Sequence, residues 1–556
     1  MGIPSYFSYI IKNYTDIIRN IHACGPFQHL FMDCNSIVYS AYHLISNEKN
    51  NDKSETKTTV QNIEKKILKE VVKQIREYIF LVRPTKSIYI AFDGVAPFAK
   101  MKQQRIRRYK TDFMSRNSPL LKVCNTVDKV TWNTTAITPG TSFMDLLNKT
   151  ITKEFQGKTK EYGVENIWIS NSNKVGEGEH KLFEKLRTDH EYFKEDQIAL
   201  YGLDSDLIML SIFHQKYCAG IQVFRESPEF NTVLDIQKNK QKPKERLKPT
   251  EQKELLFMNI SELSSAIASE MHLSVQQQQQ MVTVYDYIFM CFFLGNDFMP
   301  HFPAFNIRTH GIQILTDTYR TVIGNHPDRS FVNITTGKIN WKWVHLFIDS
   351  LAKQEHGHFV AEMNARDKNN KNNKRQWTSN TPEEQEQILH HLPIIYRGDE
   401  NYICPTESGW KQRYYRVLFN IEPTEENIRK ICINYLEGLE WVLYYYTNKC
   451  VDWRWSYKYD YPPLMSDLNR YVLSDGPDIQ WMERPAFSEN TQLAYVLPCA
   501  KLDLCKHSSM LLTKYSHWYP EKYNFQWAFC RYFWEAHPLL PEIPTEELEQ
   551  LDIMVR

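Results

Sequence analysis

Several common signatures are missing from this chain of 556 residues. It contains no CxxC pair among its eleven cysteines, and the only tight group, Cys499, Cys505 and His507, matches no standard zinc-ligand spacing. No uninterrupted apolar stretch reaches the roughly 20 residues needed to cross a bilayer. The amino terminus lacks the pattern of a secretory signal peptide. These absences favour free thiols in a reducing compartment, so we expect a cytoplasmic protein with no membrane partner.

The chain also lacks a large excess of either positive or negative charge. Lysine and arginine number 67 and aspartate and glutamate 66, so affinity for a polyanion has to come from local clusters of basic residues. One basic run, Lys238 to Lys248, is either a solvated insertion or a nuclear signal, and a nuclear location therefore stays open. Apolar residues make up 42% of the chain, which is enough for at least one large core.

Four short runs in the first half have the pattern of buried strands. They are rich in β-branched and aromatic residues and comprise His29 to Met32, Ser87 to Phe92, Asn166 to Ser170 and Gln197 to Gly202. Segments with a helical period, such as Val60 to Phe80 and Glu179 to Arg187, lie between them. Strands that alternate with helices predict an α/β fold with a doubly wound, mainly parallel sheet.

Polar stretches divide the rest of the chain. We expect surface insertions at Glu48 to Lys57, Gln237 to Lys248 and Gln276 to Gln280. The run Met363 to Gln376 is dominated by Asn, Lys and Arg and has no aliphatic residue after Ala365. It predicts a polar linker over residues 363–400, between a first region at 1–362 and a second, mostly helical region at 401–556 that is rich in Trp and Tyr.

Carboxylates follow each of the predicted strands. They are Asp33 after the first, Asp93 after the second, Glu177 and Glu179 after the third, and Asp204 and Asp206 after the fourth, while Asp297 lies at the end of an apolar helix. The carboxyl ends of parallel strands meet at one edge of a sheet, where ligands bind in α/β proteins. We therefore expect these side chains to converge.

Seven crowded carboxylates repel one another unless cations neutralise them, and oxygen ligands of this kind suit Mg²⁺ or Mn²⁺. Two such ions a few ångströms apart serve phosphodiester hydrolysis, so the pattern predicts a nuclease-type metal site. For any one acid alone a turn residue is the better interpretation. The repetition at five places favours metal binding, although Glu177 or Glu179 has the alternative role of stabilising a helix start.

One face of a predicted helix is basic. Lys100, Gln104, Arg107 and Arg108 fall at i, i+4, i+7 and i+8 and so share that face. Because guanidinium groups match phosphate oxygens bidentately, the face predicts a receptor for a terminal phosphate; the alternative is a solvated basic helix. We expect Arg105, Arg116 and Lys122 to extend the surface along a nucleic-acid backbone.

Motifs along most of the chain resemble the XRN family of 5′→3′ exoribonucleases. The first half contains segments similar to the family's first conserved region, in the same order: MGIPSYFSYI, MDCNSIV, FDGVAPFAKMKQQRIRR, ITPGT, GEGEHK, YGLDSDLIML and CFFLGNDFMPHFP. The second half contains GWKQRYY, YLEGLEWVLYYY, WRWSYKYDYPP and TQLAYVLP, which resemble the second conserved region. The resemblance implies a catalytic core like that of the PIN and flap nucleases, in a compact member that lacks the carboxyl-terminal extension domains.

The resemblance also implies a role for each candidate residue. The seven acids Asp33, Asp93, Glu177, Glu179, Asp204, Asp206 and Asp297 would be catalytic ligands of two Mg²⁺ ions, for which Mn²⁺ substitutes, and Asn35 would support them. The four residues Lys100, Gln104, Arg107 and Arg108 would hold a 5′-monophosphate. The terminal base would stack between Tyr39, where many relatives have His, and Trp453, with Trp455 as the alternative.

The implied activity is processive 5′→3′ hydrolysis of single-stranded, 5′-monophosphorylated RNA to nucleoside 5′-monophosphates by a two-metal-ion mechanism, in RNA decay such as mRNA decay. RNA is the expected partner, and we expect a monomer with no obligate protein partner. Two alternatives stay open: a flap-type, structure-specific DNA endonuclease and a catalytically inert RNA-binding scaffold. The aromatic second region argues against the first alternative, and the presence of all seven acids argues against the second.

Overall fold

The structure is a computed structural model that describes Ile3 and residues 5–51, 59–118, 132–202, 204–226, 255–271, 277–373 and 381–556. The basic run Lys238 to Lys248, most of the insertion Glu48 to Lys57, and Lys122 lie outside the described residues. The chain divides into two compact units. Unit 1 comprises Met1–Val95, Ala136–Ile288 and Tyr444–Lys449, and unit 2 comprises Ala96–Thr135, Phe289–Leu443 and Cys450–Arg556.

Unit 1 is built on a mixed sheet, which has seven strands within the described residues, in the order β1-β7-β6-β5-β2-β3-β4. The strands are β1 (Ile18–Asn20), β2 (His29–Asp33), β3 (Ser87–Ala91), β4 (Asn166–Ser170), β5 (Gln197–Tyr201), β6 (Gly220–Glu226) and β7 (Leu255–Asn259). Strands β2 to β6 run parallel, and β7 is antiparallel to both of its neighbours. The predicted α/β fold with a mainly parallel sheet is confirmed, whereas β1, β6 and β7 were not predicted.

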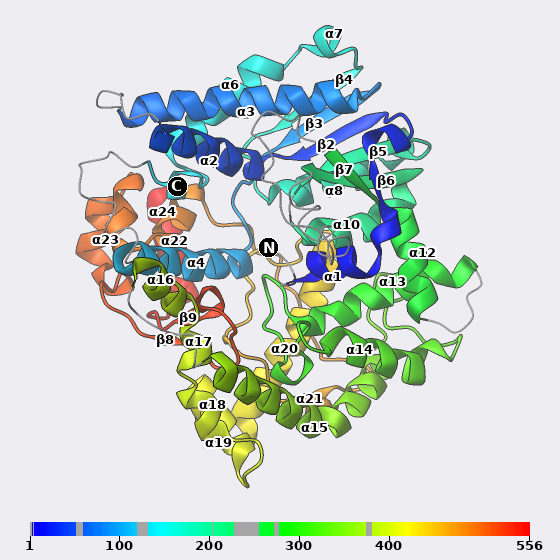
Figure 1. The fold of residues 1–556 in the computed structure, drawn as a ribbon, viewed down its shortest axis with the longest axis vertical. Helices are drawn as coiled ribbons and strands as arrows, with labels where there is room; N and C mark the ends of the chain where they lie inside the picture. The colour runs from blue at the N-terminus through cyan, green and yellow to red at the C-terminus, as the bar shows by residue number, and fades with distance from the viewer. Residues whose placement is uncertain are drawn as a thin grey trace. The chain divides into compact units, whose positions relative to one another are not determined.

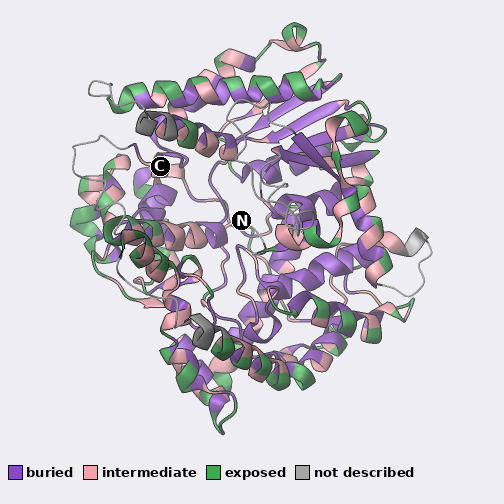
Figure 2. Ribbon diagram, viewed as in Figure 1, coloured by how far each residue is buried: buried purple, intermediate pink, exposed green. Residues whose placement is uncertain are grey.

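The middle of this sheet is buried on both faces. All five residues of β3 are buried, and β2 and β5 each have a single residue that is partly accessible (Figure 2). Helices α2 (Asn35–Asn51) and α3 (Val60–Val82) lie on one side, and α8 (Gly178–Thr188) and α10 (Asp206–His214) lie on the other (Figure 1). Because helices cover both faces of the sheet, the central strands have short, nearly continuous runs of apolar residues in the sequence.

Further helices complete unit 1: α1 (Tyr6–Asn13), α6 (Ser142–Phe155), α7 (Thr159–Tyr162), α9 (His190–Phe193), α12 (Ile260–Met271) and most of α13 (Gln277–Cys291). Local capping sets the ends of α3, where the Thr59 hydroxyl accepts a hydrogen bond from the backbone N–H of Asn62 and Arg83 adopts a positive φ of 52°. The glutamine run predicted as an insertion begins α13 from Gln277.

Unit 2 is mostly helical, as predicted for the aromatic-rich second region. Its helices are α4 (Phe98–Asn117), α14 (Gly311–Tyr319), α15 (Trp341–Asn373), α16 (Pro382–His390), α17 (Leu392–Ile395), α18 (Gly398–Ile403), α19 (Trp410–Phe419), most of α20 (Glu425–Thr447), α21 (Met465–Tyr471), α22 (Glu489–Val496), α23 (Ser508–Lys514) and α24 (Thr545–Val555). Two short strands, β8 (Phe525–Gln526) and β9 (His537–Pro538), pair with each other. No helix of the described residues is long and apolar enough to cross a membrane.

The structure differs from the predicted linker over 363–400. Helix α15 continues past residue 363 to Asn373, and α16 and α17 follow within the described residues. Two ion pairs tie the predicted linker to itself: Arg366 with Glu400 at 2.6 Å, and Arg397 with Asp367 at 2.5 Å. The Arg366 and Arg397 side chains are almost completely buried. Polar residues were interpreted as solvated because composition does not show which of them are paired inside the fold.

Candidate active site

The neighbouring strands β5, β2, β3 and β4 of unit 1 end at one edge, and acids lie there. Asp33 is the last residue of β2 and pairs in register with Ala91 of β3, while Met32 pairs with Tyr201 of β5. The remaining acids of this edge follow the ends of β3, β4 and β5: Asp93, Glu177, Glu179, Asp204 and Asp206. Six of the seven predicted acids therefore belong to unit 1 and lie on segments that leave the same edge of its sheet.

Gly178, the first residue of α8, marks where two of these carboxylates meet. Its backbone N–H donates a hydrogen bond of 2.6 Å to Asp93 Oδ1. A Cβ atom at this position would lie 2.5 Å from Asp33 Oδ1 and 3.4 Å from Asp93 Oδ1, so the approach requires glycine. The Asn35 side chain donates to Asp93 Oδ2 and accepts the Asp93 backbone N–H at 3.2 Å. Asn35 thus orients Asp93.

The carboxylates of the cluster repel one another. Burial raises the pKa of Asp33 well above its usual range, and the nearby carboxylates Asp93, Asp204 and Glu177 raise it further. Asp33 Oδ1 is buried and accepts no hydrogen bond from the described residues. A cation among these oxygens would remove the repulsion. The structure therefore brings at least four of the predicted acids within electrostatic reach of one another.

The residues fit a hard divalent cation by the chemistry of their donors, because the donor set consists of carboxylate oxygens. They are not in coordination geometry, since no group of three or more His, Cys, Asp or Glu side chains in the described part of the chain is arranged so that it could hold a metal ion. Asp33, Asp93, Glu177 and Asp204 are the residues that would hold one.

Glu179 and Asp206 lie in the first turns of α8 and α10, two helices that pack against each other. Both side chains are buried. A carboxylate in the first turn is favoured by the helix dipole, so the alternative role expected for Glu179, stabilisation of a helix start, is consistent with its position, and Asp206 occupies the equivalent position in α10.

Asp297 belongs to unit 2 and has a different environment. Its Oδ2 accepts a hydrogen bond from Lys100 Nζ at 2.5 Å and its Oδ1 accepts one from Gln103 Nε2 at 3.0 Å. Burial alone would raise the pKa of Asp297, but the Lys100 ammonium holds it well below its usual range. The structure therefore joins a predicted metal ligand to a predicted phosphate-binding residue, a pair that sequence patterns did not indicate.

The predicted basic face lies on α4. Lys100 is buried against Asp297, whereas Gln104, Arg107 and Arg108 are partly accessible. The expectation that Arg105 extends a nucleic-acid surface is wrong. Its guanidinium is buried and donates to the backbone carbonyls of Trp518 and Pro541, each at 3.0 Å. The spacing of residues along a helix does not show that an arginine is buried, because its burial depends on hydrogen-bond acceptors that lie far away in the sequence.

Exposure separates the two tryptophans proposed for base stacking. Trp455 is buried and stacks on Trp441 with ring centroids 5.2 Å apart, so it belongs to the core of unit 2. Trp453 is partly accessible, and its backbone carbonyl accepts the N–H of Phe98 at 2.8 Å. Tyr39, on α2 of unit 1, is also partly accessible. Because a base can stack only on a ring that it can reach, the exposure favours Trp453 over Trp455 as the base-stacking residue.

Tyr445 was missed by sequence reasoning. Its hydroxyl donates a hydrogen bond of 2.9 Å to Glu177 Oε1, across 268 residues of sequence. Its ring stacks on that of His180 with centroids 3.7 Å apart and an interplanar angle of 24°. The segment Tyr444–Lys449 belongs to unit 1, so an aromatic residue of the second conserved region contributes to the acidic cluster. Only its place inside the YLEGLEWVLYYY motif pointed toward it.

Lys181 is a second residue that sequence reasoning missed. Its ammonium is buried and donates to the backbone carbonyl of Phe92 at 2.7 Å and to that of Asn171 at 3.0 Å. Burial lowers the pKa of Lys181 to about 8, and the nearby Asp93 carboxylate opposes this shift. The side chain joins the segments that follow β3 and β4, and so holds the backbone next to Asp93.

Comparison with known proteins gives the family of the chain. Residues 1–227 match the sequence model of a family described as XRN 5'-3' exonuclease N-terminus, and residues 279–400 and 394–552 match one described as Xrn1 helical domain. The chain is 26% identical to 5'-3' exoribonuclease 2 of Gallus gallus and 25% identical to that of Arabidopsis thaliana, over 99% of this chain in both cases and over 69% and 66% of those relatives. It is 24% identical to 5'-3' exoribonuclease 1 of Homo sapiens, over 34% of that protein. The chain therefore belongs to the XRN family of 5'-3' exonucleases.

Proposed function

We propose that this chain hydrolyses single-stranded RNA processively from a 5′-monophosphate end, using bound Mg²⁺, and releases nucleoside 5′-monophosphates. Membership of the XRN family supports the exoribonuclease reaction. The observation that carries the metal-dependent chemistry is the approach of Asp33 and Asp93 at Gly178, on the edge to which Glu177 and Asp204 also belong.

The acidic cluster supplies the chemistry of the proposed reaction. Divalent cations held there would supply activation of a water molecule and stabilisation of the leaving oxygen of the scissile phosphate. Asp33, Asp93, Glu177 and Asp204 provide the negative charge that retains the cations. Asn35 and Tyr445 orient two of these carboxylates through the hydrogen bonds described above. Preorganised ligands keep the cost of reorganisation out of the catalytic step.

The basic face of α4 supplies selectivity for the end of the RNA. Arg107 and Arg108 present guanidinium groups that match the oxygens of a phosphate, and Gln104 adds an amide donor. Lys100 contributes an ammonium that Asp297 holds in one position at 2.5 Å. Tyr39 and Trp453 are each partly accessible, as an aromatic residue that stacks on a base has to be.

The function is tested with 3′-labelled single-stranded RNA that carries a 5′-monophosphate or a 5′-triphosphate, in Mg²⁺ or in EDTA, with a DNA strand of the same sequence in parallel. Rapid, Mg²⁺-dependent loss of only the monophosphorylated RNA supports the proposal. Indifference to the 5′ end together with cleavage at DNA junctions favours a flap-type endonuclease. Tight RNA binding without cleavage favours a scaffold.

Processivity requires its own measurement. The enzyme is bound to labelled RNA, and Mg²⁺ is added together with an excess of unlabelled RNA that captures every released molecule. Complete degradation of the bound strand under these conditions indicates processive hydrolysis, whereas a ladder of partly shortened products contradicts it.

A further inference from the structure

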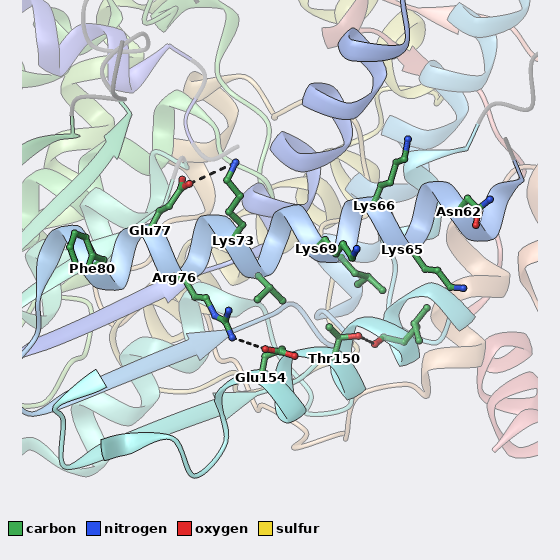
Figure 3. Close-up of a pocket in the computed structure, with 13 residues that line it drawn as sticks. Asn62, Lys65, Lys66, Lys69, Lys73, Arg76, Glu77, Phe80, Thr150 and Glu154 are labelled. Atoms are coloured by element: carbon green, nitrogen blue, oxygen red, sulfur yellow. Dashed lines mark hydrogen bonds and ion pairs between the residues drawn. The ribbon is translucent and has the colours of Figure 1, made fainter. Parts of the chain in front are cut away.

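A groove with a volume of about 1110 Å³ runs along α3 of unit 1, beside α6 (Figure 3). None of its lining residues belongs to the candidate active site. The apolar lining comes from both helices: Leu68, Val72 and Phe80 of α3, and Leu146 of α6. Phe80 is 69% exposed and Leu146 is 40% exposed. Leu68 and Val72 are buried, so the apolar side chains that stay open to water are Phe80 and Leu146, and their presence in one groove indicates a binding surface.

The rest of the lining is predominantly basic. Five cations, Lys65, Lys66, Lys69, Lys73 and Arg76, share the groove with two anions, Glu77 and Glu154, an excess of three positive charges. The anions are engaged within the groove (Figure 3), where Arg76 pairs with Glu154 at 2.7 Å and Lys73 lies 3.8 Å from Glu77. The remaining lysines all lie on the same helix, toward the end that holds Asn62. The excess charge makes an acidic partner the complementary one.

The length of the groove restricts the kind of partner. Its lining on α3 extends from Asn62 to Phe80. Eighteen steps along an α-helix span about 27 Å, which is about five helical turns. A surface of this length is matched by an extended macromolecular segment and is much longer than a mononucleotide or another small ligand.

We propose that this groove docks an acidic, amphipathic helix of a partner protein. A helix with one apolar row and flanking carboxylates would satisfy both components of the lining, as in other complexes where an amphipathic helix lies in an apolar groove. RNA fits less well, because its phosphates gain nothing from the apolar side chains of Leu68, Val72 and Leu146. This inference goes beyond the proposed function and does not depend on it.

The probe is a fluorescein-labelled peptide of about 18 residues, with leucine on one helical face and glutamate on the others, and a scrambled peptide of the same composition. Fluorescence anisotropy measures the binding of each peptide to the full chain. The amphipathic peptide should bind the wild type more tightly than the scrambled one. The double variant Lys65→Glu with Lys69→Glu should bind it at least about tenfold more weakly at low salt, with a smaller difference at high salt.

The matched control reverses Lys149 and Lys153, two exposed residues of α6 that lie outside the lining, to glutamate. It changes the net charge by the same amount and should bind the peptide nearly as well as the wild type. Phe80→Ala tests the apolar contribution and should weaken binding even at high salt. Circular dichroism and the rate of degradation of a short RNA should be unchanged in all variants.

Equal binding of the amphipathic and scrambled peptides, or equal losses in the groove variant and its control, would overturn the proposal. So would the absence of binding up to about 1 mM peptide. Displacement of the peptide by a noncleavable single-stranded RNA from the wild type, but not from the groove variant, would assign the surface to RNA instead.

Discussion

The hydroxyl of Tyr445 provides the sharpest test of how the acidic cluster is organised. Replacement by phenylalanine removes one oxygen and leaves the aromatic ring, so the stack on His180 at 3.7 Å is retained. What is lost is the hydrogen bond of 2.9 Å to Glu177 Oε1. Tyr445 and Glu177 are both buried, and water therefore does not replace the missing donor freely.

The expected magnitude follows from the type of hydrogen bond. A hydrogen bond to a charged group contributes about 1.5–3 kcal/mol, which corresponds to about a tenfold to 150-fold change in an equilibrium constant. Substitutions of residues that orient metal ligands typically reduce metal affinity or activity by about 10-fold to 100-fold. We therefore expect Tyr445→Phe to raise the Mg²⁺ concentration needed for half-maximal activity by about tenfold or more.

The assay measures kcat and KM for 5′-monophosphorylated RNA over a range of Mg²⁺ concentrations, and Mn²⁺ binding by electron paramagnetic resonance without RNA. KM for RNA at saturating Mg²⁺ should change little, because Tyr445 is predicted to act through Glu177. Tyr285→Phe is the matched control. Its hydroxyl is also buried in unit 1 but donates to the backbone carbonyl of Phe213 at 2.8 Å. The same Mg²⁺ and Mn²⁺ dependence in both variants would refute a role for Tyr445 in orienting Glu177.

Three further substitutions test other parts of the structure. Gly178→Ala places a methyl group 2.5 Å from Asp33 Oδ1 and should lower kcat by about 100-fold, because small displacements of reacting groups are costly. Asp206→Ala should abolish hydrolysis and leave RNA binding intact, as measured by electrophoretic mobility shift. Burial lowers the pKa of His301 to about 4, so between about pH 4 and 6.5 the unfolded chain binds more protons and stability falls as pH decreases. His301→Gln should remove about 2 kcal/mol of the loss in unfolding free energy between pH 7.5 and 5, measured by chemical denaturation.

Each of these substitutions has a control or a contradicting result. Gly357→Ala, in α15, meets no atom within 4 Å and should leave kcat unchanged. Turnover by Asp206→Ala would contradict the metal-ligand role that the family resemblance implies for Asp206. His517→Gln, at an exposed position, should keep the acid sensitivity of the wild type. An unchanged pH dependence in His301→Gln would show that His301 does not contribute to acid destabilisation.

Local sequence patterns were sufficient to predict the strands and the helix that carry most of the candidate site residues. The strands that end near Asp33, Asp93 and Asp204 were predicted because a buried parallel strand has a short apolar run of its own, which does not depend on distant residues. The helix that carries Arg107 and Arg108 was likewise predicted from their spacing. Strand β7 was missed because an antiparallel strand near the edge of a sheet is specified by its neighbours as much as by its residues.

Tertiary structure decided the contacts between distant residues. The hydrogen bond from Tyr445 to Glu177 spans 268 positions, and the ion pair between Lys100 and Asp297 spans 197. Neither residue type nor periodicity specifies such a partner, because the partner depends on how whole elements pack. Arg105 shows the same limit, since its burial depends on carbonyls more than 400 residues away. The sequence by itself therefore determined which residues the site offers, and the fold determined which of them orient, neutralise or bury one another.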